Sequence, residues 1–292
     1  VKKKIRPVEK KLLQLAVEPE EGRLRLLEYR RKHNVAKARL LEALLEHGEI
    51  PYDLAKDKLN ISKSTCDRMQ EEGTLTVWTQ TQYREAGNRR QMTEPEPELN
   101  PAQQALVEAF TEDYQKGDYQ TYLLHGVTGS GKTEVYMHTI DVVLEQGRQV
   151  IVLIPEIVLT FQTVMRFRRH FGDRITILNS RMSDGERYDQ FERIRRREVD
   201  IVIGPRSALF APFPNLGLIV IDEEQEGSYK SDNIPKYHAR EVAIERAELE
   251  DAKVVLGSAT PSLEAYYRAK KGEYALYTLD KRACSSSLPD VD

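Results

Sequence analysis

The octapeptide Gly-Val-Thr-Gly-Ser-Gly-Lys-Thr at positions 126–133 constrains the fold of this 292-residue chain more than any other feature. A short apolar run at 122–125 ends just before it, and a segment with helical periodicity at 132–146 follows it. In a glycine-rich loop between a strand and a helix, backbone amides can approach phosphate groups, and the positive end of the helix favours anions. The sequence therefore predicts a phosphate-binding loop at the edge of a sheet.

The side chains of this loop fit a nucleoside triphosphate with a divalent cation. Lys132 is expected to reach the β- and γ-phosphates, and the Thr133 hydroxyl is expected to bind magnesium. The predicted nucleotide-binding residues of the loop are Gly126, Thr128, Gly129, Ser130, Gly131, Lys132 and Thr133.

A second motif places two carboxylates directly after a buried strand. The apolar run at 218–221 is followed by Asp222 and Glu223, and ligands of open parallel sheets bind at the carboxyl ends of strands. Asp222 is expected to hold magnesium together with Thr133. Glu223 is expected to polarise the attacking water as a general base. Together the two motifs predict ATP hydrolysis.

Residues 99–292 alternate between short apolar runs and longer helical segments. The runs are at 122–125, 150–154, 175–179, 200–204, 218–221 and 253–257, and the helical segments are at 132–146, 156–171, 185–197 and 237–248. Continuous apolar runs suit strands buried on both faces, so this alternation predicts a doubly wound α/β domain with a parallel sheet.

Residues 1–90 predict a small winged-helix domain with an N-terminal connecting segment. Helices are expected at 36–46, 51–59 and 63–72, followed by a β-ribbon that contains a strand at 74–83, which is the winged-helix order. A further strand is expected at 10–17. Residues 91–98, within a run of spaced prolines and glutamates, predict an extended linker.

The helix at 63–72, capped by Ser62, takes the place of a DNA-recognition helix. It also carries three acidic residues, Asp67, Glu71 and Glu72, which disfavour contact with phosphates. A DNA-binding role and a spacer or docking role both stay open for this domain.

The composition of the chain excludes several classes of protein. The chain has only two cysteines, which excludes a disulfide framework and a four-cysteine metal site, and its six histidines lack the spacing of a zinc site. The apolar runs are too short to cross a bilayer, and no apolar stretch follows the lysines at the start. These features predict a cytoplasmic location and no membrane partner.

Six motifs in order along residues 99–282 resemble the bacterial replication-restart helicases of the PriA family (primosomal protein N′), which are superfamily 2 DNA helicases. Besides the glycine-rich loop they are at 99–103, 154–157, 204–210, 221–225 with 229–230 and 237–240, and 257–262. The resemblance implies a RecA-like first motor lobe over residues 99–292. It also implies ATP and magnesium as cofactors.

The resemblance implies roles for single positions. Gln103 would read adenine ahead of the phosphate loop, and Ser258 and Thr260 would couple hydrolysis to movement. The residues implied to lie along the single-strand backbone are Glu156, Thr160 and Arg206.

The segment 227–240 corresponds to an aromatic-rich loop that senses single-stranded DNA. Tyr229 and Tyr237 would offer stacking faces, and Lys230 would supply charge for phosphates. Arg240 is counted with them among the residues that bind DNA or couple it to hydrolysis. One position departs from the family: Gln225 stands where the family has histidine. Gln225 is counted among the catalytic residues, because an amide can donate and accept hydrogen bonds although it cannot carry charge.

The resemblance also implies partners and further domains. Single-stranded and forked DNA, single-strand binding protein and primosome proteins are the implied partners. A second motor lobe and a zinc module are expected after Asp292, and a domain that holds a 3′ DNA end is expected before Val1. By itself the chain is then expected to hydrolyse ATP poorly. The alternative reading is a nucleotide-responsive winged-helix regulator that prefers one duplex sequence.

Overall fold

The structure of the protein is a computed structural model that describes residues 8–82, 99–117 and 120–282. The chain divides into two compact units, Val1–Arg90 and Gln91–Asp292. The extended linker expected at 91–98 lies outside the described residues.

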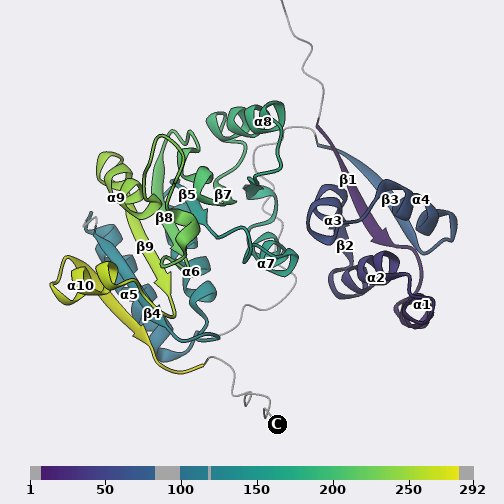
Figure 1. Ribbon diagram of the computed structural model, residues 1–292, viewed down its shortest axis with the longest axis horizontal. Helices are drawn as coiled ribbons and strands as arrows, with labels where there is room; N and C mark the ends of the chain where they lie inside the picture. Colours follow the sequence, from purple (N-terminus) through teal and green to yellow (C-terminus); the bar gives the residue numbers. More distant parts are fainter. Residues whose placement is uncertain (1–7, 83–98, 118–119, 283–292) are drawn as a thin grey trace, which may run out of the picture. The chain divides into compact units, whose positions relative to one another are not determined.

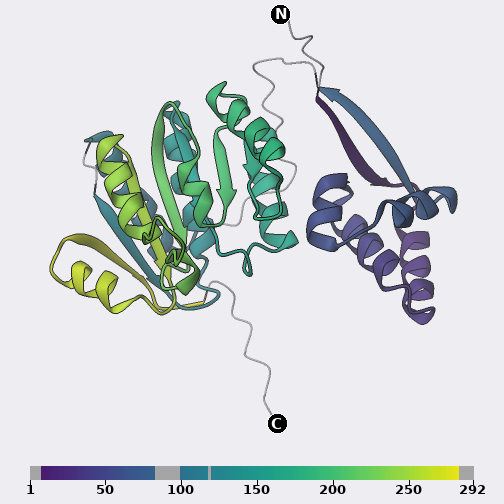
Figure 2. The same ribbon diagram turned by 45° about the horizontal axis from the view of Figure 1, so that its top comes forward.

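The first unit combines a small antiparallel sheet with helices. Its elements in chain order are β1 (Val8–Leu15), α1 (Pro19–Arg31), α2 (Val35–His47), β2 (Glu49–Pro51), α3 (Tyr52–Leu59), α4 (Lys63–Glu71) and β3 (Leu75–Gln82). The strand order is β2-β1-β3, and β1 and β3 form the long two-stranded ribbon seen in Figure 2. Leu13, Ile50 and Leu75 are buried on the face of this sheet that meets the helices.

The three predicted helices and both predicted strands of this unit are confirmed. Ser62 caps α4 as expected, since its hydroxyl accepts a hydrogen bond from the Thr65 amide at 3.2 Å. The expected order of three helices followed by a ribbon is wrong, because the partner of β3 is β1, which precedes the helices. Helix α1 was not predicted. It leaves Leu24 and Leu27 exposed, so its apolar spacing does not mark a buried face.

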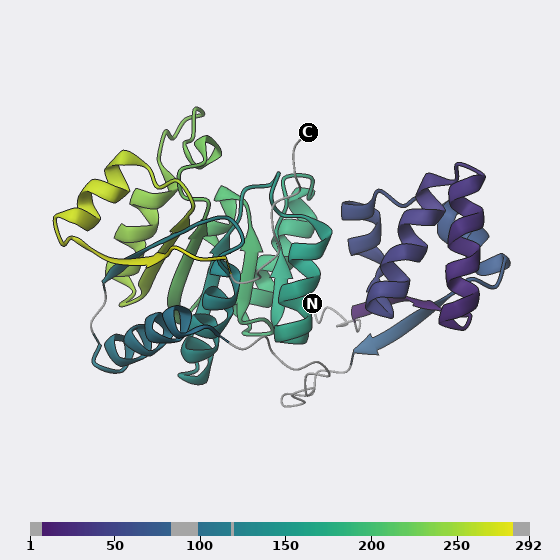
Figure 3. The same ribbon diagram turned by 90° about the horizontal axis from the view of Figure 1, so that it is seen from below.

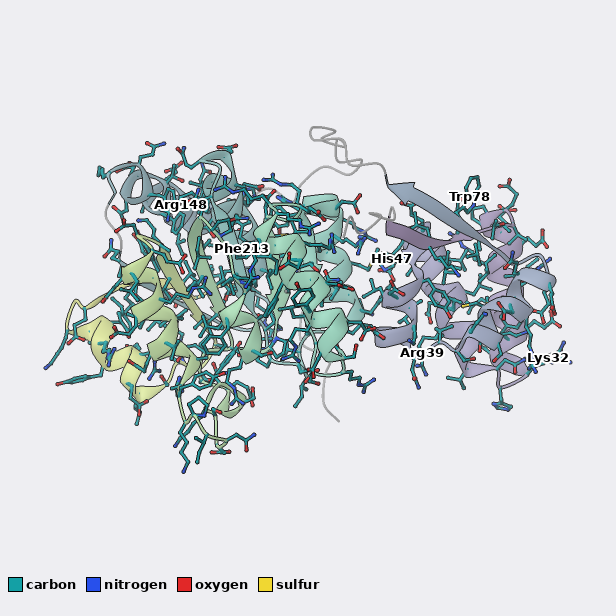
Figure 4. All side chains as sticks on the ribbon, turned by 90° about the horizontal axis from the view of Figure 1, so that it is seen from above. Lys32, Arg39, His47, Trp78, Arg148 and Phe213 are labelled. Atoms are coloured by element: carbon teal, nitrogen blue, oxygen red, sulfur yellow. The ribbon has the colours of Figure 1, made fainter. Side chains whose placement is uncertain are left out.

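One acidic charge near α4 is neutralised inside the unit. Glu72 pairs with Lys37 and accepts a hydrogen bond from the Tyr29 hydroxyl at 2.7 Å. Strand β3 exposes Trp78 (Figure 4). DNA binding by α4 stays a prediction.

The second unit is built on a seven-stranded sheet in which every pair of neighbouring strands is parallel, in the order β10-β4-β9-β8-β5-β7-β6 (Figure 1). Its strands are β4 (Thr121–Gly126), β5 (Gln149–Leu153), β6 (Ile175–Ile177), β7 (Ile201–Gly204), β8 (Leu216–Asp222), β9 (Lys253–Ser258) and β10 (Tyr274–Leu279). Its helices are α5 (Pro101–Gln115), α6 (Lys132–Glu145), α7 (Phe161–Phe171), α8 (Asp184–Arg195), α9 (Ala239–Leu249) and α10 (Leu263–Lys270), with 3₁₀ turns η1 (Gly172–Arg174), η2 (Arg206–Phe210) and η3 (Gly227–Tyr229).

Helices cover both faces of this sheet, as expected for a RecA-like lobe. The buried side chains of α8, α9 and α10 join one core with alternate residues of the strands, while α5 and α6 pack on the other face (Figure 3). All six predicted strands and the parallel α/β fold are confirmed. Strand β10 and helices α5 and α10 were not predicted.

In the described ranges, no helix has both the length and the apolar character that spanning a membrane requires.

A buried lysine attaches α5 to the sheet. Lys253 of β9 is fully buried, and its ammonium group donates a hydrogen bond to the Tyr122 hydroxyl at 3.1 Å. The same group lies over the rings of Phe110 and Tyr114 on α5, 5.3 and 5.8 Å from their centroids. A buried cation needs such contacts, because desolvation of its charge is costly. They fix α5, whose first turn reaches the phosphate loop.

The packing around Gly217 in β8 predicts that Gly217→Ala destabilises the second unit by about 1–3 kcal/mol. A Cβ atom there would lie 2.6 Å from the Tyr114 hydroxyl and 2.7 Å from side-chain atoms of Arg148 and Val143. Gly185→Ala is the matched control. Nothing lies within 4 Å of its Cβ position, and alanine favours the helix by ~0.5–1 kcal/mol. Chemical denaturation of both variants measures the difference, and equal stabilities would contradict the prediction.

Candidate nucleotide site

Parallel pairing brings the predicted site residues to one edge of the sheet. Strand β9 lies between β4 and β8, and Gly257 of β9 is the register partner of both Leu124 in β4 and Asp222 in β8. The phosphate loop, Asp222 and Ser258 therefore lie at the carboxyl ends of three adjacent strands.

The loop between β4 and α6 has the backbone conformation that a phosphate cradle requires. Gly129 and Gly131 have φ angles of 78° and 83°, a region that residues with a Cβ atom rarely adopt. A Cβ atom on Gly126 would lie 2.6 Å from Ser130 Oγ, so the loop closes only with glycine there. Thr128, which lies within the loop between Gly126 and Gly129, is exposed.

The polar groups of the loop fit an anionic ligand. The Lys132 ammonium group folds back and donates a hydrogen bond to the Gly126 carbonyl at 2.7 Å. Ser130 Oγ is buried and has no hydrogen-bond partner within the described part of the chain. A cation and a buried hydroxyl at a helix N-terminus are suitable groups for phosphate oxygens. Thr133 follows in the first turn of α6, where a hydroxyl ligand of magnesium is expected.

Gln103 supports the loop from α5. Its side-chain oxygen accepts a hydrogen bond from the Asn100 amide at 2.8 Å, which completes a capping box. Its side-chain nitrogen donates to the Ser130 carbonyl at 2.9 Å. Gln103 is therefore within contact of the phosphate loop, and its role in reading adenine stays a prediction.

Asp222 ends β8 beside the loop. Burial raises the pKa of its carboxyl group to about 6, and the charge of Glu223 adds to that shift, while Lys132 opposes it. A cation that binds Asp222 would relieve the same desolvation and repulsion, so the donor set of Asp222 and Thr133 fits a divalent ion.

Two buried tyrosines hold Asp222, and sequence reasoning assigned neither of them this role. Tyr136 on α6 donates a hydrogen bond to Asp222 Oδ1 at 2.9 Å, and Tyr229 on η3 donates to the Asp222 main-chain carbonyl at 2.7 Å. The spacing of Lys132 and Tyr136, one helical turn apart, puts both side chains on the same face of α6. This spacing is the sequence feature from which the place of Tyr136 on the same helix face as Lys132 could have been predicted.

A chain of hydrogen bonds joins Glu223 to the end of β9. The Gln225 side-chain nitrogen donates to Glu223 Oε2 at 2.8 Å, and Ser258 Oγ donates to the Gln225 side-chain oxygen at 2.5 Å. Ser258 Oγ in turn accepts from the Thr260 amide at 2.9 Å, so its own proton is directed at Gln225. The side-chain amide of Gln225 thus connects the motif that contains Glu223 with the motif that contains Ser258, and it needs no charge to do so.

Arg240 lies inside the lobe rather than on its surface. Its guanidinium group is 3.1 Å from Glu224 Oε2 and donates to Ser262 Oγ at 2.6 Å, and Arg240 and Glu224 are 6% and 1% exposed. Direct contact of Arg240 with DNA is therefore wrong for this conformation. Arg240 is the last residue of segment 227–240, and its role in coupling hydrolysis to DNA stays a prediction.

The expected stacking face of Tyr229 is also wrong. Tyr229 is 1% exposed, and its hydroxyl donates to the carbonyls of Leu153 and Asp222 at 3.0 and 2.7 Å. Its ring is part of the core that meets α9. Tyr229 therefore supports the strand ends instead of facing solvent.

Arg206 and Tyr237 are placed together beside segment 227–240. The guanidinium group of Arg206 donates to the carbonyls of Ser228 and Lys230 and lies 5.5 Å from the Tyr237 ring centroid. The exposed ring of Phe210 meets the Tyr237 ring edge to face, at 5.4 Å between centroids. Arg206 thus holds the loop that carries Lys230 and Tyr237, and both of these remain accessible.

Glu156 and Thr160 lie in the segment after β5, and both are exposed. Glu156 accepts hydrogen bonds from the Ser180 amide at 3.1 Å and the Ser180 hydroxyl at 2.6 Å. Thr160 caps α7 by accepting from the Thr163 amide at 3.3 Å. The helix predicted from residue 156 therefore begins later, at Phe161.

The fold and this site define a phosphate-loop motor lobe of the helicase type. The sequence model of the DEAD/DEAH box helicase family matches residues 100–269, and the chain belongs to this family. Its own carboxylate motif, Asp222 to Gln225, reads Asp-Glu-Glu-Gln.

Among named proteins, the chain is similar to the replication restart protein PriA of Bacillus subtilis, with 46% identity over 235 residues. That match covers 80% of this chain and 29% of the relative. Replication restart protein PriA of Chlamydia pneumoniae is 38% identical over 250 residues, which cover 85% of this chain and 33% of that protein. The chain thus spans about a third of the length of these relatives.

Among solved structures, RecG bound to a three-way DNA junction matches 65% of this chain and 25% of its own, with 22% identity and a TM-score of 0.48.

We predict that Tyr229→Phe lowers the free energy of unfolding by about 1–3 kcal/mol, because two buried carbonyls lose their donor. Its effect on affinity for single-stranded DNA should be absent. Tyr237→Phe is the control, since Tyr237 makes its contacts through its ring. Thermal unfolding and DNA titration test both. Unchanged stability with weaker DNA binding in Tyr229→Phe would show that this tyrosine faces the DNA.

Proposed function

We propose that this chain forms the ATP-magnesium site and first motor lobe of a replication-restart DNA helicase. The observation that carries the proposal is the hydrogen-bonded chain from Glu223 through Gln225 to Ser258. It connects the carboxylate beside the phosphate loop to Ser258 at the end of the neighbouring strand β9. A motor needs such a connection to transmit the state of its bound nucleotide from the hydrolytic site to other segments. A domain that only binds nucleotide does not need it.

The chain's own groups divide the work of hydrolysis. Lys132 leaves the Gly126 carbonyl to contact the β- and γ-phosphates, and Ser130 Oγ adds a buried donor. Glu223 accepts the proton of the attacking water, and Gln225 keeps its carboxylate in place. Asp222 and Thr133 would hold magnesium, which neutralises charge on the phosphates when it is bound.

We assign DNA contact to accessible groups near the same edge. Lys230 and Phe210 are exposed and Tyr237 is half-buried, so they combine an ammonium group with aromatic rings that solvent can reach. Base stacking with phosphate attraction is the usual mode of single-strand binding. Glu156 and Thr160 line the neighbouring segment. We extend the proposal to the longer protein: single-stranded and forked DNA as substrate, a second motor lobe, and single-strand binding protein and primosome proteins as partners. A cytoplasmic location belongs to the same proposal.

Two substitutions separate nucleotide binding from hydrolysis. Lys132→Ala should weaken binding of a fluorescent ATP analogue about 10- to 100-fold, because a charge-assisted contact is lost. Glu223→Gln should leave that affinity within about threefold and lower hydrolysis at least ~100-fold, since the amide cannot take a proton. Equilibrium binding and phosphate release, with and without single-stranded DNA, measure the two effects.

The DNA arm of the experiment distinguishes the helicase from a sequence-specific regulator. Binding of several unrelated forked and single-stranded oligonucleotides with equal affinity supports the helicase. Preference for one duplex sequence by orders of magnitude would overturn it in favour of the regulator.

Breaking the Gln225 bridge should slow hydrolysis without loss of nucleotide binding. We expect Ser258→Ala and Gln225→Ala each to lower the hydrolysis rate by about tenfold, because Glu223 loses its support. The double variant should be no slower than the slower single variant, since both remove the same connection. Additive losses in a double-mutant cycle would show that the two side chains act separately.

A further inference from the structure

We propose that Tyr136 is a positioning residue for the magnesium carboxylate Asp222, and that Gly257 is glycine in order to make room for it. The inference rests on the proposed ATP-magnesium site and deepens it. It assigns a task to a buried tyrosine in α6 and explains a small residue in β9.

Tyr136 reaches Asp222 from the helix that the phosphate loop begins. It is one turn beyond Lys132, it is 1% exposed, and its hydroxyl lies 2.9 Å from Asp222 Oδ1. The same helix therefore carries the lysine for the phosphates and a direct contact to the metal carboxylate. A shift of α6 would move both groups together.

Gly257 is the steric complement of Tyr136. In the register of β8 and β9 it lies opposite Asp222. A Cβ atom on Gly257 would be 1.5 Å from the Tyr136 hydroxyl and 2.7 Å from the ring carbon that bears it. Any larger residue would force the ring away, so the close approach of Tyr136 to Asp222 requires glycine at this position.

The direction of the hydrogen bond is unambiguous. The Tyr136 hydroxyl lies 2.9 Å from Asp222 Oδ1, and an ionised carboxylate has no proton to give. The hydroxyl is therefore the donor and Oδ1 the acceptor. With Oδ1 engaged, the carboxylate cannot rotate freely, and Oδ2 is left for a cation.

A second tyrosine fixes the backbone of the same residue. The Tyr229 hydroxyl donates to the Asp222 main-chain carbonyl at 2.7 Å. The main chain and the side chain of Asp222 are therefore held by separate elements, η3 and α6. Preorganisation of this kind lowers the entropy lost when a metal ion binds.

The test is a magnesium titration of nucleotide binding with Tyr136→Phe, which keeps the ring and removes only the hydroxyl. Binding of a fluorescent ATP analogue is followed at increasing Mg²⁺, and again in EDTA. We expect the half-saturating Mg²⁺ concentration to rise about tenfold, while affinity in EDTA stays within about twofold. A role in packing alone would leave the magnesium dependence unchanged.

Tyr122→Phe is the matched control. Tyr122 is also 1% exposed, and its hydroxyl donates to Asp113 Oδ2 at 2.5 Å, next to Lys253 rather than the phosphate loop. Tyr122→Phe removes a tyrosine–carboxylate hydrogen bond of the same kind from the lobe. We expect lower thermal stability and an unchanged Mg²⁺ half-saturation point. A rise equal to that of Tyr136→Phe would overturn the inference.

Gly257→Ala tests the steric part. It should lower stability and raise the Mg²⁺ half-saturation point, because the new methyl group displaces Tyr136. In a Tyr136→Ala background, the same substitution should cost little further stability, since the ring it would meet is gone. An equal loss of stability in both backgrounds would overturn the steric assignment.

Two failures can be told apart. If the unsubstituted chain shows no magnesium-dependent nucleotide binding, the proposed function itself fails. If it shows that binding, and folded Tyr136→Phe has the same Mg²⁺ half-saturation point, only the role of Tyr136 is overturned.

Discussion

The parallel pairing of β4, β9 and β8 is the constraint on which the site depends. It places the phosphate loop, Asp222 and Ser258 at one edge, although more than a hundred residues separate the first from the last. Gly257 sits between the two outer strands in register, and this one small residue lets α6 approach the edge closely. The site is thus a product of strand order and register more than of any single motif.

Each acidic side chain at this edge is paired with its own hydrogen-bond donor. Asp222 accepts from Tyr136, Glu223 from Gln225, and Glu224 from Arg240 and Ser262. Three successive acidic residues in a partly dry setting would repel each other and raise the cost of folding. Their separate partners, drawn from α6, the loop after β8, the first residues of α9 and the N-cap of α10, direct the three carboxylates apart. Under the proposed function, one motif therefore provides a metal ligand and a base, and its third acidic residue, Glu224, is a structural anchor.

Local pattern was sufficient for most elements and failed at identifiable places. The six predicted strands are buried on both faces, so their apolar runs are unmistakable. Strand β10 lies at the edge of the sheet and is fully buried only at its two ends, and α1 exposes Leu24 and Leu27, so neither shows the periodicity of an element with one buried face. The ribbon of the first unit was misjudged because its two strands, β1 and β3, are far apart in the chain. Pairing over that distance leaves no local signal.

The sequence by itself determined the phosphate loop, the strand that ends in Asp222 and Glu223, and the parallel α/β class. Each depends on residue type and spacing within a short segment. Only the tertiary structure decided that Tyr229 and Arg240 are buried, that Gln225 bridges Glu223 and Ser258, and that Tyr136 reaches Asp222. Burial and hydrogen-bond partners depend on which strands become neighbours, and a tyrosine has the same local pattern whether it faces DNA or supports a carboxylate.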